Sequence, residues 1–304
     1  MSFNFELSVN QKIELPNTHK VELYIKREDN IHQFISGNKY RKLKYNLQEA
    51  QQLGFDTLLT FGGAYSNHIA AVAAAGKTYG IKTIGVIRGE ELIDKIDTNP
   101  TLQFAQSQGM QFKFVTRSAY RDKENEGFLN TLKEEFGNFY LVPEGGTNQL
   151  AVKGCEEILQ PEDDTFDYIC CAVGTGGTIS GLINASKPHQ KILGFPALKG
   201  DFLSINISKF VTKDNWELIT DYHSGGYAKV NKALIDFINQ FKHQYSIPLD
   251  PVYTGKLMLG VIKMIEANYF KNNTKILVIH TGGLQGISGM NKRLKAKELP
   301  LINE

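Results

Sequence analysis

The chain has 304 residues, 41% of them hydrophobic, which is enough for about two domains with a sizeable core. Its 34 Lys and Arg residues and 32 Asp and Glu residues give a net charge of +2, and the basic residues are scattered. This pattern argues against nucleic-acid and membrane-surface partners. The longest apolar stretch, Ile69 to Ala75, is much shorter than the ~20 residues of a membrane-spanning helix.

The cysteines and the N-terminal segment indicate the compartment. Cys155, Cys170 and Cys171 are too few and too badly spaced for a disulfide framework or a metal site. The histidines show no spacing typical of metal ligands. The first ten residues, MSFNFELSVN, lack the basic start and apolar core of a secretion signal. We therefore expect a cytoplasmic protein with reduced core cysteines and no metal.

Short β-branched runs alternate with stretches of helical period along the chain, a pattern typical of parallel sheets flanked by helices. The predicted strands are residues 57–61, 82–87, 111–115, 139–142, 166–173, 191–195 and 275–280. The predicted helices are residues 41–53, 66–79, 148–159, 178–185, 228–241 and 255–270, with a further helix beginning near 98–100.

The domain boundaries carry no Pro/Gly/Ser linker, so a simple division into halves is not expected. The strand and helix units of residues 46–147 could form a small domain inserted into a larger one. The larger domain would combine residues 1–45 and 148–304. The fold class is then α/β, with two open, twisted, mostly parallel sheets flanked by helices.

Four loops are rich in Gly, Ser, Asn and Thr: residues 36–39, 62–67, 174–178 and 280–283. Two of them lie between a predicted strand and a predicted helix. Loops at the carboxyl ends of parallel strands form the ligand crevice of open α/β sheets. These loops are therefore the first candidates for a functional site.

The loop Gly174–Thr178 follows a buried strand and opens a helix, so its backbone N–H groups are placed to hold a phosphate. Ile179 stands where a dinucleotide fingerprint needs a third glycine, and no Gly-Lys-Ser/Thr follows, as a P-loop would require. The alternative is a tight glycine turn that packs a helix on a strand. The sequence favours the anion site.

A lysine within the glycine/asparagine loop is a candidate amine. Lys39 follows Gly37 and Asn38 and precedes Arg41 and Lys42, whose charges would disfavour its protonation. On spacing alone, a solvated surface lysine remains the simpler interpretation.

Other polar residues also have ordinary explanations. Ser66 and Asn67 are first of all a helix N-cap, and isolated tyrosines such as Tyr227 and Tyr253 are commonly half-buried core residues. We expect His280 to end its strand without a catalytic duty.

The loops, taken in order, resemble one enzyme family. Residues 26–29 (Lys-Arg-Glu-Asp) and 36–43 (Ser-Gly-Asn-Lys-Tyr-Arg-Lys-Leu) resemble the cofactor-lysine motif of the pyridoxal-phosphate enzymes that comprise D-cysteine desulfhydrase and 1-aminocyclopropane-1-carboxylate deaminase. Further segments match in sequence order at residues 62–67, 143–147, 174–178, 250–256 and 280–283. The resemblance spans nearly the whole chain, and it implies the tryptophan synthase β fold and a homodimer.

The resemblance also implies residue roles. Lys39 would form the Schiff base with pyridoxal 5'-phosphate, Asn38 would lie beside it, and Asn67 would bond the cofactor's ring hydroxyl. Ser66 would face the substrate, and Tyr227 and Tyr253 would line its pocket. The phosphate would be held by Gly174, Thr175, Gly176, Gly177 and Thr178.

Two positions separate the branches of this family. The deaminase pattern has a glutamate after the Val-Tyr pair and a leucine after the late histidine, whereas this chain has Thr254 and Thr281. Thr281 would sit beside the pyridine nitrogen, with Thr254 also at the cofactor. A hydroxyl cannot keep that nitrogen protonated as a carboxylate would, so the weaker electron sink favours expulsion of a thiolate. The chain departs from the family at residues 284–287, Leu-Gln-Gly-Ile, where Pro-Ala-Leu is usual.

The sequence therefore predicts a lyase that converts a small amino acid, D-cysteine first, into pyruvate, ammonia and sulfide. Either Lys39 or a pocket tyrosine would remove the α-proton. Aminocyclopropane-carboxylate deamination, and a dehydratase or racemase of another small amino acid, remain alternatives. A non-catalytic cofactor-binding protein is a further alternative of a different class.

Overall fold

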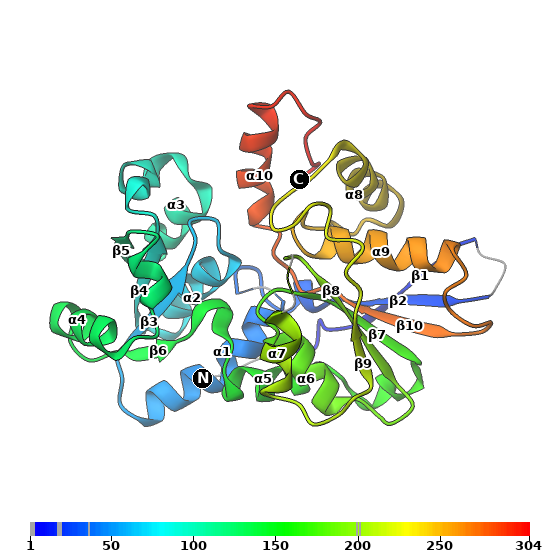
Figure 1. Ribbon diagram of the computed structural model, residues 1–304, viewed down its shortest axis with the longest axis horizontal. Helices are drawn as coiled ribbons and strands as arrows, with labels where there is room; N and C mark the ends of the chain where they lie inside the picture. The colour runs from blue at the N-terminus through cyan, green and yellow to red at the C-terminus, as the bar shows by residue number, and fades with distance from the viewer. Residues whose placement is uncertain (1–3, 17–19, 36, 199, 201) are drawn as a thin grey trace.

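The computed structural model describes residues 4–16, 20–35, 37–198, 200 and 202–304. Ser36, part of the lysine motif, therefore lies outside the described residues. The strands of the described chain form a four-stranded and a six-stranded sheet, which lie to the left and right in Figure 1 with helices around each. No helix in the described ranges is both long and apolar enough to cross a membrane.

The smaller sheet has the order β5-β4-β3-β6, and all its neighbours are parallel. Its strands are β3 (Thr57–Gly62), β4 (Lys82–Arg88), β5 (Gln111–Val115) and β6 (Tyr140–Val142). Helices α1 (Asn38–Gln52), α2 (Asn67–Tyr79) and α3 (Pro100–Ser107) pack on one face, and α4 (Glu126–Phe136) packs on the other. Because both faces are covered, β3 is buried along its whole length.

The larger sheet has the order β1-β2-β10-β7-β8-β9, and only β1 is antiparallel to its neighbour. Its strands are β1 (Asn10–Ile13), β2 (Glu22–Lys26), β7 (Tyr168–Val173), β8 (Lys191–Pro196), β9 (Trp216–Leu218) and β10 (Lys275–Ile279). Helices α5 (Gln149–Glu156), α6 (Gly177–Ala185) and α7 (Phe202–Ser208) share one hydrophobic core with the sheet. Helices α8 (Lys232–Tyr245), α9 (Thr254–Glu266) and α10 (Gly286–Lys295) share the other.

The last helix joins the two halves. In Figure 1, α10 stands between α3 and the pair α8 and α9. It contacts α3, and Lys292 Nζ donates to the carbonyl of Thr98, 2.9 Å away, just before α3 begins. Short 3-10 helices complete the described elements at Glu28–Asn30, Glu90–Thr98, Ala119–Asp122, Glu144–Gly146 and Pro161–Thr165.

All the predicted strands are present, but some helix bounds differ from the prediction. Helix α1 begins at Asn38 instead of 41, so Lys39 lies in its first turn and not in a loop. Helix α8 begins at Lys232 instead of 228, because Asn231 caps it and Ala228 has a left-handed φ of 52°. Helix α9 ends at Glu266 instead of 270. The sequence patterns missed β1, β2, β9, α4, α7 and α10.

The three cysteines are buried and unpaired, as predicted. The strands predicted for the inserted segment, 46–147, do form a separate sheet. The predicted boundary at residue 45 falls inside α1, and Leu43 and Leu47 on that helix belong to the core of the smaller sheet.

Candidate active site

A cavity of about 930 Å³ opens where the carboxyl ends of β3, β7 and β10 meet. Every site residue predicted from the sequence lines this cavity except Gly177 and Thr254. The structure therefore brings together loops that are far apart in the chain, at the edge where ligands bind in open α/β sheets.

The turn before Lys39 is fixed by a close backbone approach. Gly37 has a φ of 63°, and a Cβ there would lie 2.0 Å from the carbonyl oxygen of Thr281. The Asn38 N–H faces the same oxygen at 3.4 Å. Only glycine fits such a position. As a result, the start of α1 is held against the loop after β10, and Lys39 faces the cavity.

Lys39 has the electrostatics of a reactive amine. Its Nζ lies 3.4 Å from the neutral Oδ1 of Asn38, and no ion pair to Lys39 is found within the described ranges. Burial, with a smaller contribution from the charge of Lys42, lowers its pKa to about 7. The lowered pKa increases the neutral fraction of the amine near physiological pH. A neutral amine is the form that attacks a carbonyl carbon.

Lys42 is a site residue that the sequence analysis did not assign. It is buried, and its Nζ donates to the Gly145 carbonyl at 2.9 Å and to Thr147 Oγ1 at 3.0 Å. A Cβ on Gly177 would lie 3.1 Å from this Nζ, so the amine lies against the predicted phosphate loop. Burial lowers its pKa to about 8. The available signal was helical spacing, because Lys42 follows Lys39 by three residues on one face of α1.

The predicted phosphate loop has the geometry of an anion cradle. It connects β7 to α6, and Gly176 at the N-cap has a φ of 91° that suits glycine. The first amides of α6 point out of the helix without intrahelical partners. The hydroxyl of Thr178 is held by Asn38 Nδ2 at 2.7 Å. With Lys42 beside it, this loop fits a dianionic phosphate.

Two tyrosines form the wall next to the phosphate loop. Tyr253 packs on Gly174, where a Cβ would lie 3.3 Å from the ring, and its ring centroid is 6.3 Å from that of Tyr227 in an edge-to-face pair. Burial raises the pKa of both phenols, with the larger effect at Tyr253. Both remain protonated at neutral pH, so each phenol is available as a hydrogen-bond donor to a ligand. They are poor candidates for a base.

The loop that carries Tyr227 has a strained backbone and is held in place by a side chain of α9. Ser224 and Ala228 have positive φ angles of 53° and 52°, and both are non-glycine residues. The Nζ of Lys256, which is 3% exposed, donates to the Gly226 carbonyl at 2.8 Å. This buried contact from α9 fixes the loop, and with it the position of the Tyr227 ring.

Ser66 and Asn67 lie at the start of α2, and both also line the cavity. Ser66 Oγ caps α2 by accepting from the backbone N–H groups of His68 at 3.2 Å and Ile69 at 3.4 Å, as the N-cap interpretation predicts. Asn67 is the first residue of α2, and its Oδ1 accepts from Gln285 Nε2 at 2.6 Å.

His68 is a buried polar group in the same wall. Its Nε2 lies 2.8 Å from Thr60 Oγ1, while its Nδ1 has no hydrogen-bond partner among the described residues. Burial and the nearby charges of Lys39 and Lys42 hold the pKa of His68 well below its usual value. The wall therefore offers a neutral imidazole to the cavity.

Thr254 and Thr281, the two residues that separate the branches, have different surroundings. The Thr254 hydroxyl donates to Asp250 Oδ1 at 2.9 Å and accepts from the Asp250 N–H at 2.8 Å, and it does not line the cavity. Asp250 does line the cavity, and burial raises the pKa of its carboxyl. Thr281 also lines the cavity, and it is 8% exposed.

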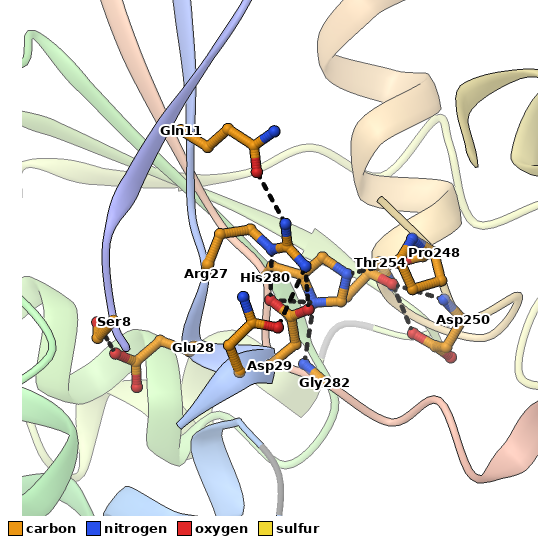
Figure 2. Close-up of polar contacts among 11 residues, drawn as sticks. Ser8, Gln11, Arg27, Glu28, Asp29, Pro248, Asp250, Thr254, His280 and Gly282 are labelled. Carbon is orange, nitrogen blue, oxygen red and sulfur yellow. Dashed lines mark hydrogen bonds and ion pairs between the residues drawn. The ribbon is translucent and has the colours of Figure 1, made fainter. Parts of the chain in front are cut away.

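His280 is not among the residues that line the cavity, and it ties two loops together (Figure 2). Its Nε2 is 2.7 Å from the Pro248 carbonyl, and its Nδ1 accepts from the Gly282 N–H at 3.2 Å. Arg27 holds Asp29 through two hydrogen bonds of 2.9 and 2.8 Å, and Asp29 faces the imidazole at 3.5 Å. His280 therefore positions the loops that carry Thr281 and Asp250.

A near-neutral lysine, an anion cradle and tyrosines in one cavity define an enzyme that binds a phosphorylated carbonyl cofactor through a lysine. Residues 9–282 match the family described as "Pyridoxal-phosphate dependent enzyme", and the chain belongs to this family. Its cofactor is pyridoxal phosphate, and its fold is that of the tryptophan synthase β family.

Relatives narrow the comparison within this family. A Thermotoga maritima protein named "Putative 1-aminocyclopropane-1-carboxylate deaminase" is 32% identical, over 92% of this chain and 94% of its own length. The Arabidopsis thaliana bifunctional D-cysteine desulfhydrase/1-aminocyclopropane-1-carboxylate deaminase is also 32% identical, over 90% of this chain and 74% of its own. A solved structure titled as an ACC deaminase homologue superposes with a TM-score of 0.77 at 27% identity, covering 90% of this chain and 88% of that one.

Proposed function

We propose that the protein is a lyase that converts D-cysteine and water into pyruvate, ammonia and hydrogen sulfide. The α-proton and the β-thiolate leave the substrate, and hydrolysis of the remaining enamine gives pyruvate and ammonia. The names of the relatives at 32% identity support a small amino acid as the substrate. The residues at positions 254 and 281 favour D-cysteine among the candidates.

The residues would share the work as follows. Lys42 and the loop Gly174–Thr178 would hold the phosphate, and Lys39 would attach the cofactor. Bound pyridoxal phosphate supplies an electron sink that stabilises negative charge at the substrate's α-carbon. Lys39, freed when the substrate amine takes its place, would accept the α-proton, because its pKa near 7 suits a base at neutral pH. Tyr253 would hold its phenol proton and donate to the departing sulfur.

The observation that carries the proposal is the place of Thr281 in the cavity wall. The deaminase pattern has leucine at this position, and its glutamate is replaced by Thr254, whose hydroxyl is bound to Asp250. A hydroxyl beside the pyridine nitrogen would not fix a positive charge there. A weaker sink suffices for expelling a thiolate and makes opening a cyclopropane harder.

The test is a screen for keto-acid release by the holoenzyme. D- and L-cysteine, D- and L-serine, β-chloroalanine and aminocyclopropane carboxylate are offered, and racemisation is followed separately by chiral chromatography. We expect pyruvate and sulfide from D-cysteine and little keto acid from aminocyclopropane carboxylate. A preference for the cyclopropane, for serine, or for racemisation alone contradicts the assignment. Cofactor binding without turnover of any compound would indicate a non-catalytic protein.

Aminocyclopropane-carboxylate deamination is the second candidate, because the Arabidopsis relative carries both names. The variant Thr281→Leu restores the leucine of the deaminase pattern and removes the hydroxyl. We expect it to lower sulfide release and to raise keto-acid release from aminocyclopropane carboxylate. A glutamate at 254 would be placed beside the buried carboxyl of Asp250, so Thr254→Glu should be combined with Thr281→Leu only after folding is checked.

The assembly and domain organisation are part of the same proposal. We propose a cytoplasmic homodimer in which residues 46–147 form the small domain and residues 1–45 and 148–304 the large one. Light scattering coupled to gel filtration measures the mass of the particle. A monomer at micromolar concentration contradicts the dimer and leaves the chemistry untouched.

A further inference from the structure

The segment where this chain departs from its family, Leu284–Ile287, makes a direct contact with a predicted cofactor residue. Gln285, the N-cap residue of α10, donates from Nε2 to Asn67 Oδ1 at 2.6 Å. Both side chains are half-buried, and both line the cavity. The two residues come from opposite halves of the molecule, since Asn67 begins α2 beside the smaller sheet.

The surroundings of Asn67 leave its amide little freedom. Gly283 has a φ of 90°, and a Cβ on it would lie 2.5 Å from Asn67 Nδ2. A Cβ on Gly286 would lie 3.5 Å from Asn67 Oδ1. The amide is thus packed between two glycines, and its donor partner Gln285 lies between them in the chain. With Oδ1 occupied by Gln285, the amino group is the end that lies over Gly283 in the cavity wall.

We infer that Gln285 is a positioning residue that sets which end of the Asn67 amide faces the cofactor. The inference rests on the proposed binding of the cofactor's ring oxygen by Asn67. That oxygen is a hydrogen-bond acceptor when ionised, so it needs the N–H end of the amide and is repelled by the C=O end. The side-chain N–H of Gln285 binds the carbonyl end of the Asn67 amide and so keeps it away from the cofactor.

Two substitutions separate orientation from packing. In Gln285→Glu the side chain keeps its shape but can only accept, so it attracts the Asn67 amino group and turns the carbonyl toward the cofactor. In Gln285→Met the side chain keeps its length and has no donor, so neither orientation is enforced. The predicted order of cofactor affinity is wild type, then Met, then Glu. A purely space-filling role predicts no such order.

The experiment titrates the apo-protein with pyridoxal phosphate and records the dissociation constant and the absorbance maximum, without substrate. We expect about threefold weaker binding for Gln285→Met and at least about tenfold for Gln285→Glu, with a shifted absorbance maximum only for Glu. Gln106→Glu, at an exposed position of α3, controls for the added charge and should match wild type. Circular dichroism and thermal unfolding check that each variant is folded.

Lowering the pH gives a second arm with the same proteins. A protonated glutamate regains a donor, so the affinity ratio of Gln285→Glu to wild type should approach one as the pH falls toward the carboxyl pKa. Equal effects of Glu and Met, or an affinity ratio independent of pH, overturn the inference. The titration uses no substrate. Its outcome therefore does not depend on the desulfhydrase assignment, and a lack of activity on D-cysteine would not change the measured cofactor affinities.

Discussion

The first two turns of α1 carry cations on two sides, and the sides differ in the charge of the partner that each cation meets. Arg41 points away from the cavity and meets the carboxylate of Glu28 through hydrogen bonds of 2.8 and 2.7 Å, with Ser8 also bonded to Glu28 and the Phe5 ring 3.8 Å from the guanidinium. Lys39 and Lys42 face the cavity, where their hydrogen-bond partners are neutral.

The difference lies in the partner. A buried cation paired with a carboxylate has its charge balanced inside the protein, whereas a buried amine with neutral partners has a lowered pKa. The pKa values of about 7 for Lys39 and about 8 for Lys42 follow from this. Within two turns of one helix, the chain therefore separates a structural cation from two cations available to a ligand.

The largest effect is expected for Lys39→Ala. The variant lacks the amine that attaches the cofactor, so activity should fall by at least about 10³-fold and the absorbance of the bound cofactor should be lost. Borohydride reduction followed by peptide mapping locates the adduct in wild type. Lys44→Ala, on the same helix but away from the cavity, is the matched control. An adduct on another lysine would contradict the assignment.

Removing the structural cation should act on stability instead. Arg41→Met leaves Glu28 buried without its partner, and we expect a loss of about 3–5 kcal/mol in the free energy of unfolding. Urea denaturation measures this. The double variant Arg41→Met/Glu28→Leu should recover most of the loss, because it removes the stranded charge. If the double variant is as unstable as the single one, packing and not charge explains the effect.

Lys42→Met should weaken the cofactor without unfolding the protein. A charge-assisted hydrogen bond to phosphate contributes about 1.5–3 kcal/mol, which corresponds to about 10- to 100-fold in the dissociation constant. Equilibrium titration of the apo-protein with pyridoxal phosphate measures it, and pyridoxal without phosphate is the control ligand. A similar loss for both ligands would show that Lys42 does not act on the phosphate.

The smallest effect is a shift of a pH profile. Because the pKa of Lys39 is lowered to about 7, its neutral fraction grows as the pH rises, and the rate of cofactor capture should rise through pH 7 and then level off. The charge of Lys42 contributes to this lowering, so Lys42→Met should move the midpoint to higher pH. Stopped-flow absorbance follows the capture. A midpoint near the ordinary lysine value in wild type would contradict the assigned environment.

The sequence predicted the central strands well because they are continuous β-branched runs buried on both faces. It missed β2, Glu22–Lys26, whose charged ends hide the apolar residues between them, and α10, whose glycines and cations obscure a helical period. The start of α1 was placed too late because Gly37 and Asn38 look like loop residues. The contact that requires this glycine, with the Thr281 carbonyl, comes from a loop far away in the chain.

The site followed from the order of its loops, but the roles of individual cations did not. Arg41 and Lys42 are adjacent and chemically alike in sequence, and only the fold places Glu28 beside the first and Gly145 beside the second. In the sequence, Thr254 and Thr281 look equivalent as cofactor residues. In the fold, the hydroxyl of Thr254 donates its hydrogen bond to the carboxylate of Asp250. Gln285 could be noticed only as a departure, because its partner Asn67 lies on a distant helix.

The order of strands also has a consequence for synthesis on the ribosome. The smaller sheet uses one continuous stretch, from β3 to β6, so it can pair while translation continues. The larger sheet is completed by β10, where Val278 pairs with both Ile25 and Cys170. Strand β2 therefore lacks its partner β10 until almost the entire chain has been synthesised. Until then the nascent protein exposes an unpaired strand edge, to which a chaperone or another strand can bind.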